Sequence, residues 1–360
     1  MTAPILIMAG GTGGHVFPAL AVARELRARD EEIVWLGTRH GLEAELIPQE
    51  GIPLEWTRIR GLRGKGALTW LLAPFKLTVA VFDALAILIR WRPKVVLGMG
   101  GFAAGPGGIA AWLLRKPLII HEQNAVAGLT NRLLAGLARE VLEAFPGSFS
   151  ARVKAHPVGN PVRPEITALP EPEQRLSGHD GNLRVLVLGG SLGAKVLNEI
   201  VPQAVASLSP DRRPEIMHQA GSATFEIAEA AYDAAGVQAR VERFIDNVAE
   251  AYGWADMVIC RAGALTISEL AAAGLGAVLV PYPHAVDDHQ TRNAEYLVAA
   301  GAAIMIPQAE LTPELLAAEI ETCIANRQIV IERSIRARAM ARPGATREVA
   351  DRCLALAASP

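Results

Sequence analysis

Short apolar runs alternate with amphipathic stretches along almost the whole chain. Apolar runs of four to six residues are typical of strands buried on both faces, and apolar residues three or four apart are typical of helices. Repeated alternation of the two predicts βαβ units and parallel sheets, and therefore an α/β fold. The expected strands are 5–8, 33–36, 95–97, 118–120, 141–144, 185–188, 215–219, 241–244, 257–259, 277–280 and 302–306. The expected helices are 18–29, 107–114, 130–137, 194–207, 223–235, 265–273, 290–300 and 313–324.

The pattern runs through the chain twice, which indicates two similar halves. The length of 360 residues agrees, because domains usually hold ~100 to 200 residues. Segment 156–174 between the halves is rich in proline and is expected to be a hinge and linker with a ligand cleft beside it. We therefore expect an N-terminal domain 1–158, a C-terminal domain 159–342 and a final helix within 343–360 that packs back on the first domain.

Two glycine-rich turns follow expected strands, at 5–15 (ILIMAGGTGGH) and 185–195 (VLVLGGSLGAK). Glycines let backbone N–H groups approach a diphosphate, and a helix that follows directs the positive end of its dipole at it. Neither turn has the GxGxxG spacing of dinucleotide sites or the GKS/T ending of a P-loop, which argues against NAD, FAD and ATP. The repeated turn favours a nucleotide-linked donor.

His15 closes the first turn, at the expected N-terminus of a helix. The positive end of the dipole disfavours a protonated imidazole there, so a neutral His15 is suited to accept a proton. A lone histidine in a loop is more often structural or exposed, but its place inside this turn favours a functional role. The polar segment 121–124 (HEQN) follows another buried strand, where α/β proteins bind ligands, although Asn124 could instead cap a helix.

Segment 260–274 (CRAGALTISELAAAG) reads as a strand end, a glycine turn and a helix start. The backbone N–H groups of Ala264, Leu265 and Thr266 would form a second anion site. Glu269, one turn further on, either serves the helix or binds the two hydroxyls of a ribose. Loop 281–294 contains two adjacent aspartates but lacks the DxD spacing of metal-dependent sugar transferases, so we expect no obligatory metal. Stimulation by a loosely held divalent cation stays open, because such an ion leaves no ligand motif.

Stretch 55–95 is basic, with eight Lys or Arg residues against two acids. Apolar residues recur through it at helical spacing, including Leu68, Leu72, Phe75, Val79 and Phe82. Charges within the stripe, among them Lys76, make it a poor membrane span. The stripe is either the core face of ordinary helices or a patch that rests on an anionic membrane surface.

Composition excludes several classes of protein. The chain is 51% apolar and 20% charged with a net charge of −2, which predicts large cores and gives no reason to expect nucleic acid as a partner. Its three cysteines lack CxxC spacing and are expected to be reduced thiols of a cytoplasmic protein. The N-terminus has no basic region followed by a long apolar run, so secretion is not expected.

Eight segments in the same order across nearly the whole chain resemble the MurG family of bacterial N-acetylglucosaminyltransferases, which convert lipid I to lipid II in peptidoglycan synthesis. These segments are GGTGGHVFPALA, GLRGKG, GMGGFAAGPGG, HEQNAVAGLTNRLLA, VGNPVR, GGSLGAKVLN, CRAGALTISELAAAG and DDHQTRNA. The resemblance implies a GT-B fold of two Rossmann-like domains, with the acceptor and the membrane on the first and UDP-GlcNAc on the second. It also implies an inverting transfer to undecaprenyl-diphosphoryl-MurNAc-pentapeptide.

The resemblance further implies the role of individual residues. Thr12, Gly13, Gly14 and Asn124 would face the donor from the first half, and His15 would be the general base. Gly13 and Gly14, with Gly100 and Gly101, would hold the acceptor diphosphate. The remaining donor residues would be Arg163, Ser191, Ile245, Ala264, Leu265, Thr266, Glu269 and Gln290.

Partners and location follow from the same resemblance. We expect UDP-GlcNAc and lipid I as substrates, the anionic cytoplasmic face of the inner membrane as the peripheral attachment surface, and cell-wall synthesis and division proteins as further candidate partners. Two alternatives are another nucleotide-sugar enzyme of this fold, such as a diacylglycerol glycosyltransferase or a UDP-GlcNAc 2-epimerase, and a non-catalytic UDP-GlcNAc-binding scaffold. The third glycine-rich run, 98–108, suits a second diphosphate and weighs against the other enzymes.

Overall fold

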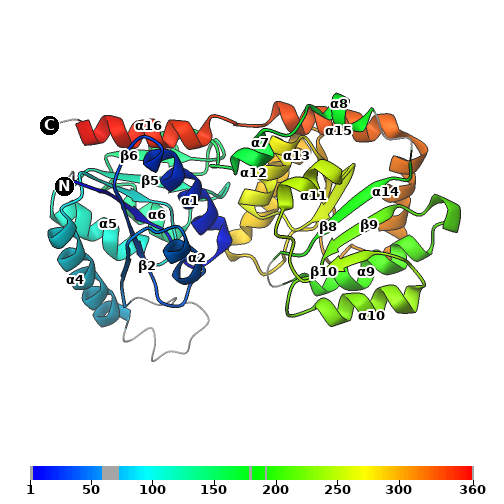
Figure 1. Ribbon diagram of the computed structural model, residues 1–360, viewed down its shortest axis with the longest axis horizontal. Coiled ribbons are helices and arrows are strands. Elements are labelled where there is room, and N and C mark those ends of the chain that lie inside the picture. The colour runs from blue at the N-terminus through cyan, green and yellow to red at the C-terminus, as the bar shows by residue number, and fades with distance from the viewer. Residues whose placement is uncertain (1–2, 59–72, 178–180, 191–192, 359–360) are drawn as a thin grey trace. The chain divides into compact units, whose positions relative to one another are not determined.

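The chain folds into two compact units, shown in Figure 1. Unit 1 is Met1–Arg163 with Pro343–Pro360, and unit 2 is Pro164–Arg342. The structure is a computed structural model that describes residues 3–58, 73–177, 181–190 and 193–358. Each unit is Rossmann-like, and the division falls at Arg163 rather than at residue 158.

Unit 1 is built on a seven-stranded sheet in the order β3-β2-β1-β4-β5-β6-β7, with every neighbouring pair parallel. Its strands are β1 (Ile5–Met8), β2 (Ile33–Gly37), β3 (Leu54–Trp56), β4 (Val95–Gly98), β5 (Leu118–Glu122), β6 (Glu140–Glu143) and β7 (Ala155–Pro157). Its helices in the described residues are α1 (Gly13–Arg27), α2 (Glu43–Gln49), α4 (Ala73–Trp91), α5 (Ala104–Leu113), α6 (Leu129–Leu134) and α16 (Ala345–Ala358).

Unit 2 repeats the plan with a six-stranded parallel sheet in the order β10-β9-β8-β11-β12-β13. Its strands are β8 (Arg184–Leu188), β9 (Glu215–Gln219), β10 (Arg240–Glu242), β11 (Met257–Cys260), β12 (Gly276–Leu279) and β13 (Ala303–Met305). Its α-helices in the described residues are α7 (Pro164–Thr167), α8 (Pro172–Leu176), α9 (Lys195–Ala206), α10 (Phe225–Ala235), α11 (Val248–Trp254), α12 (Ala264–Ala273), α13 (His289–Ala299), α14 (Pro313–Ala325) and α15 (Arg327–Ala339).

The expected start of the first helix is wrong by five residues. Pro18 suggests a first helical turn, but α1 begins at Gly13 and continues through Pro18. Pro18 is the sixth residue of the helix, so it removes the N–H that would donate to the Gly14 carbonyl. The helix N-terminus therefore lies directly on the glycine turn, with His15 as its third residue.

The expected hinge and linker, 156–174, does contain the division between the two units, but most of its secondary structure belongs to one unit or the other. Within 156–174, strand β7 pairs with β6, while α7 packs on α12 and α8 packs on α15. Pro164 and Pro172 each occupy the first position of a short helix, where a missing N–H costs nothing. Two of the five prolines in this segment therefore start helices, and the chain passes from one unit to the other between Arg163 and Pro164.

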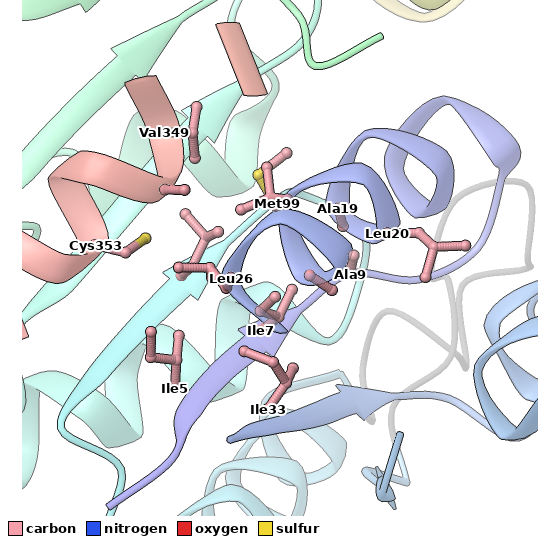
Figure 2. Packing of buried hydrophobic residues seen from close by; sticks show 14 of the residues in the cluster. Ile5, Ile7, Ala9, Ala19, Leu20, Leu26, Ile33, Met99, Val349 and Cys353 are labelled. Carbon is pink, nitrogen blue, oxygen red and sulfur yellow. The ribbon is translucent and has the colours of Figure 1, made fainter. Parts of the chain in front are cut away.

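The last helix, α16, completes the core of unit 1. It packs on α1, and in Figure 2 Val349 and Cys353 lie over the same apolar cluster as Leu26 and Met99. Outside this core, Arg352 reaches Glu140 on β6 at 3.1 Å. The three cysteines are buried and free.

A buried histidine of unit 2 forms hydrogen bonds between its own strand and two helices. His218 on β9 lies 3.0 Å from the hydroxyl of Tyr232 on α10 and 3.0 Å from Oδ1 of Asn198 on α9. Asn198 donates hydrogen bonds from Nδ2 to the carbonyl oxygens of Ala220 and Thr224, so its Oδ1 accepts a hydrogen bond from the N–H at His218 Nε2. Burial lowers the pKa of His218 to about 3, so the folded protein keeps this ring neutral.

We expect His218→Gln to reduce the acid sensitivity of the fold. An unfolded histidine binds a proton below about pH 6.5, whereas folded His218 stays neutral down to about pH 3. The free energy of unfolding is therefore not reduced by His218 above about pH 6.5. It falls as the pH drops from about 6.5 towards 3, by about 1.4 kcal/mol per pH unit for one proton. Glutamine retains a donor and an acceptor but cannot take up that proton.

Urea unfolding at pH 7, 6 and 5 measures this slope. The exposed His156 supplies the control, since His156→Gln should leave the slope of the wild type unchanged. Equal slopes for the wild type and His218→Gln would contradict the prediction.

Candidate functional site

The polar loops of unit 1 follow three adjacent strands, β1, β4 and β5. In the sheet, β1 has β2 as its neighbour on one side and β4 on the other. The order in which strands are added to the sheet therefore reverses between β1 and β4. Ligands of open α/β sheets bind outside the carboxyl ends of the strands at such a reversal. The glycine turn after β1, the loop after β4 and the HEQN segment at the end of β5 meet at this edge.

The first turn places backbone N–H groups at the start of a helix. Thr12 is the exposed N-cap residue of α1, and its carbonyl accepts from the N–H groups of His15 and Val16. Gly13 and Gly14 are the first two helical residues, whose N–H groups have no acceptor within a helix. This is the arrangement that binds an anionic oxygen.

The loop after β4 lies against that turn. Gly100 and Gly101 have φ angles of 88° and 80°, which favour glycine. A Cβ on Gly101 would lie 2.2 Å from the carbonyl oxygen of Gly10, and a Cβ on Gly100 would lie 2.6 Å from Nδ1 of His15. Glycines at both positions therefore allow the two loops to touch, and the expected grouping of Gly13, Gly14, Gly100 and Gly101 is found in one place.

His15 contacts the third loop. Its Nδ1 lies 2.8 Å from Oε1 of Gln123 in the HEQN segment. Gln123 in turn lies 3.0 Å from Nδ1 of His121, whose Nε2 lies 2.9 Å from the carbonyl oxygen of Gly159. The sequence indicates each of these polar residues but not the contacts that join them.

A buried carboxylate that the sequence analysis missed holds the glycine turn. Glu43 on α2 is fully buried and accepts the Gly11 N–H at 2.9 Å, the Thr38 N–H at 2.9 Å and the Thr38 hydroxyl at 2.8 Å. A Cβ at Gly10, Gly37 or Gly41 would come within 2.7 Å of this side chain. The three glycines therefore make room for the carboxylate, and they are the signal that points to it.

Asn124 does not cap a helix, because the N-cap of α6 is Gly128. Its N–H and its Nδ2 both donate to Oε1 of Glu122, at 2.9 and 3.2 Å, and the other oxygen of Glu122 accepts from the Gly128 N–H and from Asn131. A second buried carboxylate therefore shapes the loop that carries Asn124 and Gln123.

Unit 2 builds its site on the equivalent strands β8, β11 and β12. Ala264, Leu265 and Thr266 form the first turn of α12, with Gly263 as the N-cap residue. Glu269, further along the same helix, is buried and accepts a hydrogen bond of 3.2 Å from the hydroxyl of Tyr252 on α11. The expected anion site and carboxylate therefore share one helix, and Tyr252 is a residue that the sequence did not indicate.

Gln290 lies at the start of α13 beside that turn. Its Oε1 accepts the N–H groups of Ala262 and Tyr282, at 3.2 and 2.9 Å. The side chain can therefore offer a ligand the donors of Nε2, which suit hydroxyl oxygens. Of the other expected donor residues, Ile245 is buried after β10, Arg163 stacks over the Phe17 ring in unit 1, and Ser191 lies outside the described residues.

Family profiles match both units. Residues 5–143 match the glycosyltransferase family 28 N-terminal domain, and residues 184–349 match the C-terminal domain of the same family. The chain belongs to glycosyltransferase family 28. The expected GT-B fold of two Rossmann-like domains is thereby confirmed.

Individual members of family 28 are similar over the full length. The chain is 58% identical over 357 residues to the UDP-N-acetylglucosamine--N-acetylmuramyl-(pentapeptide) pyrophosphoryl-undecaprenol N-acetylglucosamine transferase of Nitrosococcus oceani, covering 99% of each. It is 58% identical to the Marinobacter nauticus protein of that name, covering 97% of this chain and 96% of the relative. The crystal structure of Acinetobacter baumannii MurG aligns with a TM-score of 0.84 at 42% identity, covering 98% and 99% of the two chains. The resemblance to the MurG family is confirmed.

The basic apolar stretch of this family 28 chain is helical where it is described. Phe75 and Phe82 on α4 are 70% and 64% exposed, Lys76 is exposed and Val79 is half-buried. Leu68 and Leu72 lie outside the described residues. The opposite side of α4 joins the core through a set of buried residues, namely Ala80, Ala84, Ile87 and Leu88. One side of α4 is therefore a core face, as the first alternative expects, and the membrane patch stays a prediction.

Two of the basic residues in this stretch are paired with its two acids. Arg58 pairs with Asp83 at 2.6 Å, and Arg90 pairs with Glu55. A search of the described residues finds no helix long and apolar enough to cross a membrane. The same residues contain no group of three or more His, Cys, Asp or Glu side chains placed to hold a metal ion.

We expect Glu43→Gln to destabilise unit 1. The amide keeps an acceptor for Thr38 but presents a donor to the Gly11 N–H, and a buried donor left without an acceptor costs about 1 to 3 kcal/mol. Urea unfolding measures the loss. Glu45 lies on the same helix but is exposed, so Glu45→Gln is the matched control and should change stability by less than about 0.5 kcal/mol. Equal effects of the two substitutions would show that the buried carboxylate does not hold the turn.

Proposed function

We propose that this chain is the inverting glycosyltransferase that moves GlcNAc from UDP-GlcNAc to the 4-hydroxyl of MurNAc in undecaprenyl-diphosphoryl-MurNAc-pentapeptide. The chain is 58% identical, over 99% of its length, to a relative whose name describes this transfer, and that similarity supports the choice of substrates. The observation that carries the chemistry is His15 in the first turn of α1, in contact with two further loops at the carboxyl edge of the sheet. A general base and an anion-binding helix terminus are there combined in one turn.

Unit 2 holds the donor in this proposal. The N–H groups at the start of α12 and the turn before α9, which includes Ser191, bind the diphosphate. Glu269 accepts the ribose hydroxyls while Tyr252 orients its carboxylate. The backbone at Ile245 faces the uracil edge, and Gln290 donates from Nε2 to the sugar hydroxyls.

Unit 1 holds the acceptor. Gly13 and Gly14 offer helix N-terminal N–H groups to its diphosphate, and the loop of Gly100 and Gly101 closes against them. Thr12 and Asn124 flank this position, and Arg163 lies beside α1 over Phe17. A second diphosphate site suits an acceptor that is itself a lipid diphosphate, which diacylglycerol is not.

The reaction is a single displacement at the anomeric carbon. The acceptor hydroxyl oxygen forms the new bond as the bond to the UDP oxygen breaks on the opposite face, which inverts the α-linked donor to a β-1,4 product. His15 accepts the hydroxyl proton, and the positive helix termini stabilise the charge that develops on UDP. This division of work requires no obligatory metal ion, and a divalent cation would only assist the departure of UDP.

The exposed apolar side of α4 is the surface that we propose rests on the cytoplasmic face of the inner membrane. Phe75, Phe82 and Ile89 are exposed on α4, as is Trp112 on the neighbouring α5. Burial of these apolar side chains and attraction between the basic residues of the stretch and anionic lipid would together supply the attachment. The lipid acceptor would reach the glycine loops from this surface, and cell-wall synthesis and division proteins would bind elsewhere on the chain.

We expect the wild type to transfer radiolabelled GlcNAc from UDP-GlcNAc to a short-chain lipid I analogue. His15→Ala should lower kcat by about 10²-fold to 10⁴-fold, the usual contribution of a general base, with little change in donor affinity. Glu269→Ala should weaken donor binding by about 10-fold or more, because hydrogen bonds to a charged group contribute about 1.5 to 3 kcal/mol.

Binding of UDP-GlcNAc without transfer to the lipid I analogue would overturn the proposal. Transfer to diacylglycerol or epimerisation of the donor would then identify another nucleotide-sugar enzyme. Binding with no turnover of any kind would identify a scaffold.

We expect Tyr252→Phe to weaken UDP binding by about 3- to 10-fold, because one hydrogen bond contributes about 0.5 to 1.5 kcal/mol. The hydroxyl touches Glu269 rather than the nucleotide, so the loss arises from a less well oriented carboxylate. Titration calorimetry measures the affinity. Tyr296→Phe is the matched control, since the Tyr296 hydroxyl donates to the Met340 carbonyl instead. Equal affinities of Tyr252→Phe and wild type would show that Tyr252 does not position Glu269.

A further inference from the structure

The side-chain amide of Gln123 has one orientation that its surroundings allow. Its Nε2 lies 3.2 Å from the carbonyl oxygen of His121 and 3.0 Å from Nδ1 of the same residue. A carbonyl oxygen only accepts, so the group that faces it must be the NH₂ end of the amide. The oxygen of the amide therefore faces His15.

That orientation decides which nitrogen of His15 carries the proton. Oε1 of Gln123 only accepts, and it lies 2.8 Å from Nδ1 of His15. The neutral ring must then hold its proton on Nδ1, which leaves the lone pair on Nε2. A free histidine side chain prefers the opposite tautomer, with the proton on Nε2, so the contact with Gln123 reverses the intrinsic preference.

His121 supports the same direction of hydrogen bonding from the other side. Its Nε2 lies 2.9 Å from the Gly159 carbonyl and must donate to it, so in the neutral ring Nδ1 accepts from Gln123. Burial lowers the pKa of His121 to about 4, which keeps that ring neutral near pH 7. The three hydrogen bonds therefore point in one direction. His15 donates to Gln123, Gln123 donates to His121, and His121 donates to the Gly159 carbonyl.

Further contacts hold the backbone around these hydrogen-bonded side chains. Nδ2 of Asn160 donates to the Gln123 carbonyl at 3.0 Å, and Gln123 and His121 are about 1% exposed or less. A Cβ on Gly100 would lie 3.2 Å from Gln123 Oε1 as well as 2.6 Å from His15 Nδ1, so only a glycine leaves the bond between the two side chains undisturbed. Every member belongs to unit 1.

We propose that Gln123 is a positioning residue that, oriented by His121, fixes His15 as the Nδ1-protonated tautomer and so makes Nε2 the atom that accepts the proton of the acceptor hydroxyl. The assignment of the tautomer stands on unit 1 alone, whereas its catalytic consequence rests on the proposed function. Gln123 does not touch the reacting atoms in this role. It differs from a carboxylate partner in that it orients the imidazole without adding a charge.

The test is the tautomer of His15 by nitrogen-15 NMR of histidine-labelled full-length protein at pH 8, with His15→Gln used to assign the resonance. We expect Nδ1 to carry the proton in the wild type. In Gln123→Met, which retains the size of the side chain without its polar atoms, the ring should shift towards the Nε2-protonated form. A wild-type ring protonated on Nε2, or a ring unchanged by Gln123→Met, would overturn the proposal.

Kinetics of the same variants test the consequence. The kcat of Gln123→Met should fall at least about 10-fold towards that of His15→Ala, since misplacing a base forfeits part of the 10²-fold to 10⁴-fold that general-base catalysis supplies. The KM of Gln123→Met for UDP-GlcNAc should change less than twofold. Gln123→Glu retains an acceptor for His15 and should keep the wild-type tautomer. An unchanged kcat in a variant whose tautomer has shifted would overturn the positioning role. A wild type with the expected tautomer but without transfer activity would instead contradict only the proposed function.

Discussion

The site of unit 1 depends on the close approach of two glycine loops at the carboxyl ends of β1 and β4. A side chain at Gly101 would overlap the carbonyl oxygen of Gly10, and one at Gly100 would overlap the His15 ring. Neighbouring parallel strands bring these loops within reach, but only a missing Cβ lets them touch. Because the loops touch, a helix N-terminus and an imidazole can share one small region with the HEQN segment.

Buried polar groups, rather than apolar packing, keep these loops in place. Glu43 satisfies donors of the first glycine turn and of the loop after β2, while Glu122 satisfies donors around Asn124. Such loops contain few apolar side chains, so a buried carboxylate with three or four hydrogen bonds is an effective way to fix their shape. Unit 2 follows the same principle at different positions, with Gln290 accepting the Ala262 and Tyr282 N–H groups.

The sequence predicted the strands of both sheets because a parallel strand buried on two faces must be an apolar run, as β1, β4 and β8 are. It missed β3 and β7, which are edge strands of three residues without a buried apolar run, although it found β10 and β13, which are equally short edge strands. It also indicated that a helix follows the first glycine turn with His15 at its start, because local chemistry determines that arrangement. Glu43 and Tyr252 could not be found in this way, because their roles arise from contacts with residues distant in the sequence.

The amide beside His15 has a consequence for the proposed diphosphate site of unit 1. A carboxylate in that position would orient the imidazole equally well, but it would place a negative charge next to the N–H groups that must attract phosphate oxygens. An amide contains both an acceptor and donors, so Gln123 can pass the orientation of His121 to His15 and add no further negative charge beside the helix terminus. The neutral chain of hydrogen bonds is thus compatible with the proposed base and the proposed anion site in the same turn.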